Sequence, residues 1–339
     1  MIVHGRAYPR AGLVGNPSDG YFGKTISFTF SDFQAEVLLY ESPDLEILPN
    51  ERDHSRFESI RQLAQDVRMH GYYGGIRLLK ACVKRFCDHC EEQRIPLDDR
   101  NFTLRYRSTI PTQVGLAGSS AIITACMRAL MAFYQVSIPK PILANLVLSV
   151  ETKELGIPAG LQDRVAQVYE GLVYMNFDRA IMDRQGYGLY EELDPALLPP
   201  VYVAYRATLA EGTEVFHNNI RARWERGEPE VVEAMQHWAE LAEKVRALLL
   251  AGRKHEIAPL LNENFDLRRK IYRISQGNIQ MVETARAVGA SAKFSGSGGA
   301  IVGTYTDEAM FRRLEQALLP IGVRVLQPQI VTSSPGAVP

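Results

Sequence analysis

The segment 111–121 has the residue types of a loop that binds phosphate. It reads Pro-Thr-Gln-Val-Gly-Leu-Ala-Gly-Ser-Ser-Ala and lies between a predicted strand and a long apolar helix. Gly115 and Gly118 let backbone N–H groups approach phosphate oxygens, and the start of the helix adds unsatisfied N–H donors and the positive end of its dipole. Ser119 and Ser120 can each cap the helix, or one hydroxyl can face a magnesium ion on the phosphates. A Gly-Ser loop before a helix is also often a capped turn, so both interpretations stay open on this segment alone.

Two acidic residues could serve phosphoryl transfer, which requires a positioned nucleotide, a cation and an oriented hydroxyl. Glu151 ends a predicted helix over 142–150, and Asp163 follows a loop that leads into a predicted helix over 164–169. Each residue also has a structural interpretation. Aspartate before a helix is a common N-cap, and Glu151 could be an ordinary surface residue.

One apparent phosphate motif is misleading. Gly23, Lys24 and Thr25 resemble the end of a Walker A loop, but that motif requires glycine at the position of Ser18. The residues after Thr25 alternate as a strand does, whereas a Walker loop opens a helix. The sequence therefore argues against a P-loop enzyme.

The cysteines allow a zinc interpretation and a simpler one. Cys87 and Cys90 have the spacing of metal ligands, and His89 lies between them. A closed structural site needs a second pair from another segment, so free thiols on a helix of a reduced cytosolic protein are the favoured interpretation.

Composition excludes several classes of partner. The 339 residues carry 38 basic and 39 acidic side chains, giving a formal charge of −1, with no long block of one sign. Such a balance argues against a sustained electrostatic interaction with nucleic acid or anionic lipid. No signal peptide or membrane-spanning run of apolar residues is evident, so we expect a cytoplasmic protein without a membrane partner.

Hydrophobic periodicity places these residues in a first domain over 1–182. Strands are predicted near residues 10–15, 25–30, 36–40 and 102–106, and a helix over 72–94. Residues 119–134 are almost continuously apolar, which predicts a helix buried on most faces at the centre of this domain.

The rest of the chain, 183–339, is predicted to form a second domain. A strand over 201–205 precedes helices over 232–249 and 257–272, two strands that flank a Gly-rich turn near 296, a helix over 307–318 and a last strand over 323–331. This order favours a helix-backed antiparallel sheet. Residues 333–339 are expected to fray.

Three segments in order resemble the motifs of the GHMP kinase superfamily, which includes galactokinase and the homoserine, mevalonate and phosphomevalonate kinases. Residues 111–121 match every defining position of the second motif, Pro-x-x-x-Gly-Leu-x-x-Ser-Ser-Ala; residues 9–19 resemble the first, and residues 293–300 resemble the third. The resemblance implies an α+β fold of two domains, with an N-terminal domain like ribosomal protein S5 domain 2 and a ferredoxin-like C-terminal domain. It also implies ATP and Mg²⁺ as cofactors.

The resemblance assigns roles residue by residue. Asp163 would orient or deprotonate the acceptor hydroxyl, and Arg10 would stabilise charge on the transferred phosphoryl group. Ser120 and Glu151 would hold Mg²⁺. The nucleotide phosphates would lie against the residues of the second motif, which are Pro111, Gly115, Leu116, Ala117, Gly118, Ser119, Ser120 and Ala121.

Further segments resemble one branch of this superfamily, the glucuronokinases, which convert glucuronate and ATP into glucuronate 1-phosphate. They are residues 15–25, 71–75, 154–169 and 278–299. The first motif departs from galactokinases, which have Gly-Glu-His-Thr-Asp-Tyr where this chain has Gly-Asn-Pro-Ser-Asp. The loss of a carboxylate suits an acidic sugar, whose own carboxylate requires a cation or a cluster of N–H donors.

The resemblance therefore predicts a small-molecule sugar acid as the substrate. Lys24 and Arg164 are the candidate cations for its carboxylate. The other expected substrate contacts are Asp19, Tyr72, Tyr73, Gly296, Ser297 and Gly298. Tyr72 and Tyr73 could equally pack a Gly-rich turn. Two alternatives remain: a GHMP kinase for another acceptor, such as galactose, arabinose or mevalonate, and a non-catalytic relative that senses a ligand.

Overall fold

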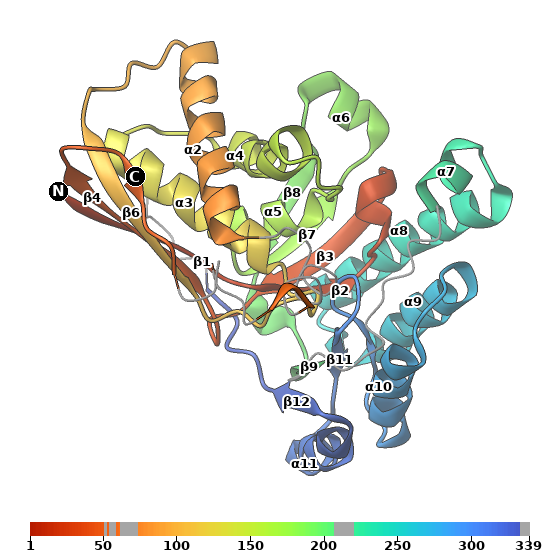
Figure 1. Cartoon of the computed structure of the whole chain (residues 1–339). Helices are drawn as coiled ribbons and strands as arrows, with labels where there is room; N and C mark the ends of the chain where they lie inside the picture. The colour runs from red at the N-terminus through yellow and green to blue at the C-terminus, as the bar shows by residue number, and fades with distance from the viewer. Residues whose placement is uncertain (51–52, 54–58, 62–73, 207–219, 333–339) are drawn as a thin grey trace.

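The computed structural model describes residues 1–50, 53, 59–61, 74–206 and 220–332. Three four-stranded sheets and their helices make up this part of the chain (Figure 1). Tyr72, Tyr73 and the terminal segment 333–339 lie outside the described residues.

The first sheet supports the helix that was predicted to be central. Its strand order is β1-β4-β6-β5; the strands are β1 (Ile2–Ala7), β4 (Ala35–Ser42), β6 (Asn101–Ser108) and β5 (Glu46–Ile47). Helix α3 (Gly118–Tyr134) packs on β1 and β4, and α2 (Gly75–Glu92) packs on α3. Most side chains of α3 are buried, as its continuous apolar sequence predicts.

The second sheet has helices on both faces. Its order is β2-β3-β7-β8; the strands are β2 (Arg10–Val14), β3 (Lys24–Thr29), β7 (Leu172–Asn176) and β8 (Leu189–Leu193). Arg10 lies opposite Thr29 and bonds to helix α5 (Gln162–Tyr169). Lys24 lies an odd number of positions from Thr29, so it points to the other face, which helix α8 (Pro229–Leu250) covers.

The third sheet is ferredoxin-like. Its order is β10-β11-β9-β12, with all pairs antiparallel; the strands are β10 (Lys293–Phe294), β11 (Ala300–Thr304), β9 (Val201–Arg206) and β12 (Val323–Leu326). The chain runs from β9 through helices to the hairpin β10-β11, then through α11 (Glu308–Leu318) to β12, which is the split βαβ order. The predicted helix-backed antiparallel sheet is confirmed.

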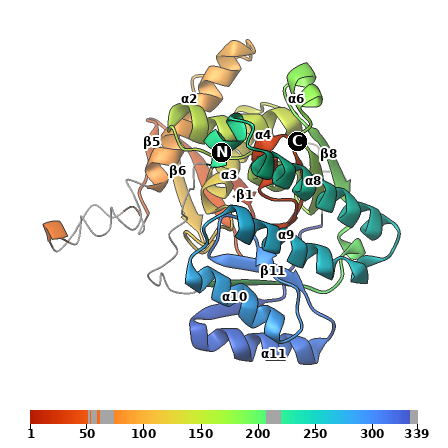
Figure 2. The same ribbon diagram turned by 90° about the vertical axis from the view of Figure 1, so that its right-hand side faces the viewer.

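Four more helices pack around these sheets or connect their strands. They are α4 (Lys140–Ser149), α6 (Arg179–Gln185), α9 (Ala258–Ile271) and α10 (Gln276–Ala287). Figures 1 and 2 both show α10 and α11 at the opposite end of the molecule from α2. Among the helices in the described ranges, none is both long and apolar enough to cross a membrane.

The predicted domain boundary at 182/183 stays a prediction; residues 182 and 183 both lie in α6, and β8 pairs with β7. The structure differs from the predicted strands at two places. The last strand ends at Leu326 rather than 331, since Pro328 has no N–H for a ladder, and Ile330 instead forms a bridge with Phe30. Strand β1 was not predicted; it pairs with β4 in a different sheet from β2.

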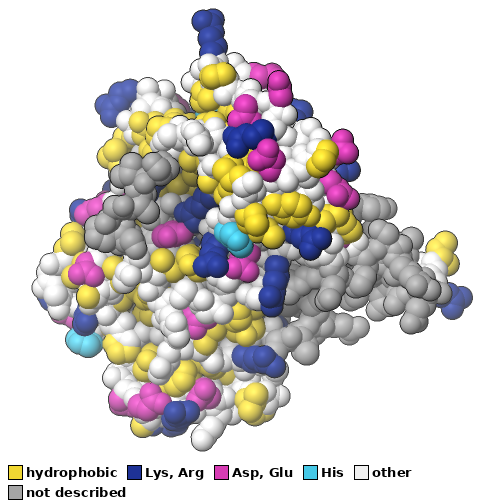
Figure 3. Space-filling model, turned by 90° about the vertical axis from the view of Figure 1, so that its left-hand side faces the viewer, with side chains coloured by type: hydrophobic (Ala, Val, Ile, Leu, Met, Phe, Trp, Pro, Cys, Tyr) yellow, Lys and Arg dark blue, Asp and Glu magenta, His cyan; other side chains and the backbone are white. Residues whose placement is uncertain are grey.

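The cysteines are free thiols, and three of them, Cys82, Cys87 and Cys90, lie on α2. Within the described ranges, no group of three His, Cys, Asp or Glu side chains is arranged to hold a metal ion. Acidic and basic side chains are interspersed over the face of the molecule shown in Figure 3, as the balanced composition suggests.

Candidate active site

The start of α3 presents free backbone N–H groups in the predicted phosphate loop. Ala117, at the N-cap, has a left-handed conformation with φ of 62° and provides no side-chain cap. The N–H groups of Gly118, Ser119 and Ser120 bond to no residue in the part of the chain that is described. These three residues form the first turn, and Gly118 and Ser119 are only half-buried. The helix start therefore retains the donors that bind an anion.

The other residues of the loop serve mainly to shape it. Gly115 has φ of 70°, and a Cβ added there would lie 2.7 Å from the carbonyl oxygen of Gly298, so the second and third motifs touch at a position that requires glycine. Leu116 and Ala121 are buried, and Pro111 lies half-buried at the beginning of the loop.

The two serines of the second motif have different partners. Ser119 donates its hydroxyl proton to Glu151 Oε1 across 2.9 Å, whereas Ser120 donates to the carbonyl of Ala117 at 3.2 Å. The predicted pairing of Ser120 with Glu151 is therefore not observed, because the Ser120 hydroxyl turns back to its own helix. A carboxylate and a hydroxyl are the hard oxygen ligands that Mg²⁺ prefers, so Glu151 and Ser119 fit the cation.

Glu151 is a buried residue rather than a surface one. It lies in the π-helical turn Val150–Glu154 after α4, and only 3% of it is exposed. Its second oxygen, Oε2, accepts a hydrogen bond from the Arg164 guanidinium. The surface interpretation of Glu151 is wrong.

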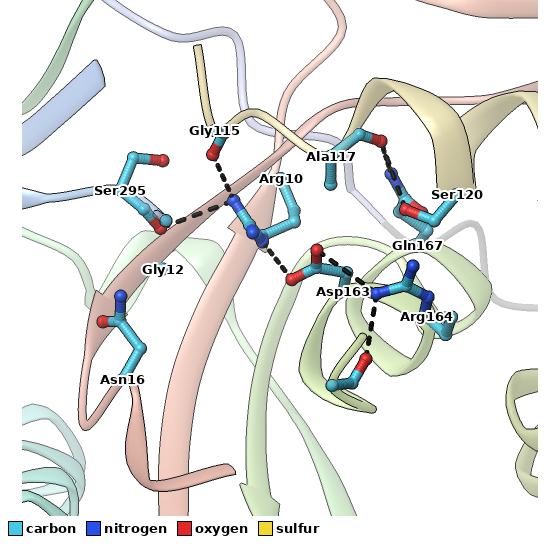
Figure 4. Close-up of polar contacts among 12 residues, drawn as sticks. Arg10, Gly12, Asn16, Gly115, Ala117, Ser120, Asp163, Arg164, Gln167 and Ser295 are labelled. Atoms are coloured by element: carbon cyan, nitrogen blue, oxygen red, sulfur yellow. Dashed lines mark hydrogen bonds and ion pairs between the residues drawn. The ribbon is translucent and has the colours of Figure 1, made fainter. Parts of the chain in front are cut away.

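Arg10 and Asp163 form the central ion pair of the site (Figure 4). Arg10 Nε donates to Asp163 Oδ1 at 2.6 Å, and Nη1 donates to the carbonyl of Gly115 at 2.7 Å. Nη1 also lies 3.4 Å from the carbonyl of Ser295 in the third motif. Arg10 therefore connects all three predicted motifs with Asp163.

Asp163 is held ionised by its neighbours. Burial raises the pKa of Asp163, but the charges of Arg10 and Arg164 outweigh this and lower it below the usual value. The residue lies in the first turn of α5, where the N-cap is Leu161, so the N-cap interpretation of Asp163 is wrong. One turn further along, Gln167 Nε2 donates to the carbonyl of Ala117 at 2.8 Å. Residues four apart lie on one helix face, so this bond directs Asp163 toward the phosphate loop.

Asp19 joins this pair from the short helix η1 (Ser18–Tyr21). Burial, followed by the charge of Asp163, raises the pKa of Asp19 to about 6, while Arg10 acts in the opposite direction. A Cβ added at Gly160 would lie 2.4 Å from Asp19 Oδ2, so the loop before α5 approaches this carboxylate closely. Two carboxylates thus lie beside one arginine.

The third motif forms the turn that lies against this cluster. Gly298 and Gly299 have φ of 138° and 80°, and Asn278 Oδ1 accepts a hydrogen bond from the Gly299 N–H at 3.0 Å. A Cβ added at Gly296 would lie 3.0 Å from Arg10 Nη2, and Ser297 is exposed. The turn therefore lies between Arg10 and the outside of the molecule.

Both cations predicted to bind the sugar carboxylate form ion pairs with other residues of the protein. Lys24 donates to Glu243 of α8 at 2.7 Å, on the opposite face of the second sheet from Arg10, so it is not part of the cluster. Arg164 is buried and pairs with Glu151, and its Nη1 donates to the carbonyl of Gly160 at 2.9 Å. The geometry therefore gives no support to the prediction for Lys24, because strand register turns its side chain toward α8.

Several residues of the site were not predicted from the sequence. Asn16 and Lys293 are buried between β2 and β10, where Lys293 Nζ donates to Asn16 Oδ1 at 2.6 Å and to the carbonyl of Gly12. Ser119 and Gln167 were also missed as partners of Glu151 and Ala117, and Arg268 as a partner of Gly296. Lys293 is the first residue of the segment that resembles the third motif, which is the one available sequence signal for it.

Comparisons with known proteins find one matching family and two similar plant proteins. Residues 77–171, which include the phosphate loop, Glu151 and Asp163, match the family described as GHMP kinases N terminal domain. The chain is 47% identical over 308 residues to an Arabidopsis thaliana protein named probable glucuronokinase 2, covering 89% of this chain and 84% of that protein. It is 45% identical over 306 residues to glucuronokinase 1 of the same plant, with coverage of 88% and 84%.

Solved structures show the same fold. The galactokinase of Lactococcus lactis, complexed with galactose, superposes with a TM-score of 0.73 over 97% of this chain and 94% of that one. The two sequences are 14% identical, so the likeness concerns the fold alone. The predicted two-domain α+β fold is confirmed.

Proposed function

The chain belongs to the GHMP kinase family, and from this membership we propose that it transfers the γ-phosphoryl group of ATP to the anomeric hydroxyl of glucuronate. The products are glucuronate 1-phosphate and ADP. The substrate follows from the two plant relatives, which are named glucuronokinases and align with most of this chain. The observation that carries the reaction is the hydrogen bond between Arg10 and Asp163 beside the open start of α3.

The free N–H groups at the start of α3 and the glycines of the second motif provide the site for the nucleotide phosphates. Backbone donors at a helix N-terminus bind an anion without a change in the protein's own charge. The half-buried state of Gly118 and Ser119 leaves these donors accessible to a ligand. The contact between Gly115 and Gly298 brings the third motif against the same loop.

Asp163 positions the attacking hydroxyl, and Arg10 stabilises negative charge on the group being transferred. A carboxylate that stays ionised accepts a hydrogen bond from the sugar hydroxyl and increases its nucleophilicity. The depressed pKa of Asp163 makes it a weak base. It therefore suits an orienting role better than the role of a base that removes the proton of the sugar hydroxyl before attack. Arg10 already touches both Asp163 and the phosphate loop, so it is placed to hold the developing charge.

Glu151 and Ser119 would hold Mg²⁺. When bound, the cation neutralises charge on the nucleotide phosphates. Glu151 Oε1 and the Ser119 hydroxyl converge, while Arg164 binds the other oxygen of Glu151 and fixes the orientation of the carboxylate. The cytoplasmic location stays a prediction from the sequence.

An acceptor screen tests this function. Purified protein with Mg·ATP should produce ADP when glucuronate is added, and the product should be the 1-phosphate by ³¹P and ¹H NMR. Turnover of galactose, arabinose or mevalonate without turnover of glucuronate would make the protein a GHMP kinase for another acceptor. If no acceptor in the screen causes ATP consumption, the non-catalytic alternative is the better one.

A further inference from the structure

A buried arginine from the C-terminal part of the chain reaches the third motif. Arg268, in the last turn of α9, is 7% exposed, and its Nη1 donates to the carbonyl of Gly296 at 2.9 Å. Its guanidinium carbon lies 5.2 Å from the ring centre of Tyr272 and 5.1 Å from that of Phe294. Two aromatic rings and one carbonyl therefore hold this guanidinium in a fixed position.

Arg268 differs from the other arginines of the site because it has no carboxylate partner. Arg10 pairs with Asp163 and Arg164 with Glu151. For Arg268, no ion pair forms with any residue in the described ranges, and Nε and Nη2 make no hydrogen bond to those residues. Neither nitrogen belongs to the buried polar atoms that lack both a hydrogen-bond partner and exposure to solvent. A buried cation whose remaining donors reach open space is suited to bind an anion.

Arg268 lies beside the reacting groups. It bonds to Gly296, the residue after Ser295, whose carbonyl Arg10 approaches at 3.4 Å. Burial lowers the pKa of Arg268, while the charges of Tyr272 and Asp19 oppose this effect. Even so, a guanidinium keeps its charge at neutral pH. The cation is thus close to both Asp19 and the Arg10–Asp163 pair.

We propose that Arg268 binds the carboxylate of the sugar acid and so determines the preference for a uronate over a neutral sugar. This inference rests on the proposed function. It assigns to a residue of α9 the role predicted for Lys24 and Arg164, which form ion pairs with Glu243 and Glu151.

The chemistry of the substrate supports this assignment. In the pyranose form of glucuronate, the anomeric carbon and the carbon that bears the carboxylate are the two neighbours of the ring oxygen. A cation that binds the carboxylate must therefore lie near the residue that orients the anomeric hydroxyl. Arg268 meets this condition through Gly296, Ser295 and Arg10, whereas Lys24 is on the other face of the second sheet.

A phosphate of the nucleotide is the other anion that Arg268 could bind. The neighbours of Arg268 favour the sugar, because they are Asp19 and the hydroxyl-bearing Tyr272, which itself interacts with Tyr21. Hydroxyls and a carboxylate suit the hydroxyl groups of a sugar. The negative charge of Asp19 repels a triphosphate, which carries several negative charges, more strongly than the single charge of a uronate.

Substitution of Arg268 with a neutral residue tests the proposal. Arg268→Gln should raise KM for glucuronate by about 10- to 100-fold, the effect of losing a charge-assisted hydrogen bond, and leave KM for ATP close to that of the unsubstituted protein. Glucuronamide, in which the carboxylate is replaced by a neutral amide, provides the decisive comparison. The unsubstituted enzyme should prefer glucuronate to glucuronamide in kcat/KM, and Arg268→Gln should lose this preference.

The neighbouring Arg269 provides a matched control, since it lies on the same turn but pairs with Glu283 on the surface. Arg269→Gln should keep the preference. Arg268→Lys retains the charge and should recover part of the preference, and it serves as the second variant if Arg268→Gln does not fold.

Each outcome has one meaning. An unchanged preference in folded Arg268→Gln would show that Arg268 only supports the third motif, and a selective rise in KM for ATP would assign it to a phosphate. Either result overturns the inference and leaves the proposed function intact. Failure of the unsubstituted protein to bind glucuronate in calorimetry would overturn both.

Discussion

The guanidinium of Arg10 lies between the Asp163 carboxylate, at 2.6 Å from Nε, and the carbonyl of Gly115, at 2.7 Å from Nη1. One side chain of β2 therefore fixes the distance between the first turn of α5 and the loop before α3. Because 21% of the Asp163 side chain is exposed, the carboxylate retains access to a substrate while it holds this bond. The arrangement makes separate roles for the two residues testable.

Asp163→Asn should reduce turnover by about 10²- to 10⁴-fold, the usual contribution of a positioned carboxylate to proton transfer. The amide keeps the size of the side chain but loses the charge that we propose orients the acceptor hydroxyl. Calorimetric binding of an ATP analogue should remain close to that of the unsubstituted protein, because the proposed site for the phosphates is the start of α3. Asp183→Asn, at an exposed position of α6, is the control. Near-full activity of Asp163→Asn would remove Asp163 from the mechanism.

Arg10→Met should shift the acid limb of the pH–rate profile to higher pH. Burial raises the pKa of Asp163, and the positive charge of Arg10 is the largest of the effects that lower it. Its removal lets burial raise the pKa of Asp163, so a larger fraction of the carboxylate is protonated at any mildly acidic pH. The variant should also lose rate at all pH values. The measurement is kcat/KM as a function of pH. A lower rate with an unmoved acid limb would mean that Asp163 ionisation does not limit the reaction.

Ser119→Ala should weaken divalent-cation binding more than Ser120→Ala does. Ser119 donates to Glu151, whereas Ser120 donates to the carbonyl of Ala117. Mn²⁺ can replace Mg²⁺ as a paramagnetic probe, and titration of the ADP complex followed by electron paramagnetic resonance gives its affinity directly. We expect a loss of roughly tenfold or more for Ser119→Ala and for Glu151→Gln, as for other changes around bound metals. The opposite ranking of the two serines would restore the pairing predicted from the sequence.

The features that were predictable from the sequence are those that depend on local spacing. The phosphate loop, the buried helix α3 and the Gly-rich turn of the third motif are each contiguous, so residue type and order identify them. Asp163 and Arg10 were predicted through the resemblance of their segments to known motifs. Their mutual hydrogen bond spans 153 positions and was not itself inferred.

The features that were not predictable depend on register and on packing between distant elements. Lys24 has the right charge and lies near the first motif, but its position relative to Thr29 turns it toward α8. Arg268 was missed because basic residues in the last turn of a helix are ordinary partners of the helix dipole. Only the fold shows that Arg268 is buried, unlike its neighbour Arg269.

Asp19→Asn should make the protein more stable at neutral and alkaline pH. Burial is the main reason that the pKa of Asp19 rises to about 6, so keeping this residue ionised has a cost in the folded state. A pKa raised from 3.8 implies a native state that binds more protons than the unfolded state between about pH 4 and 6. The Asp19 contribution to stability is therefore fully present below about pH 4 and is lost as the pH rises through 6.

The expected gain for Asp19→Asn is about 1–3 kcal/mol in the free energy of unfolding at pH 8, from a shift of roughly two units at 1.36 kcal/mol each. It should decline toward zero as the pH falls to 4. Urea unfolding at several pH values measures it, and Asp44→Asn, at an exposed position after β4, should show no such trend. The same variant should lose affinity for glucuronate, because Asp19 lies beside Asp163 and Arg10, where we propose that the sugar binds. A destabilised Asp19→Asn at pH 8 would mean that hydrogen bonds of the Asp19 carboxylate outweigh the cost of burying its charge.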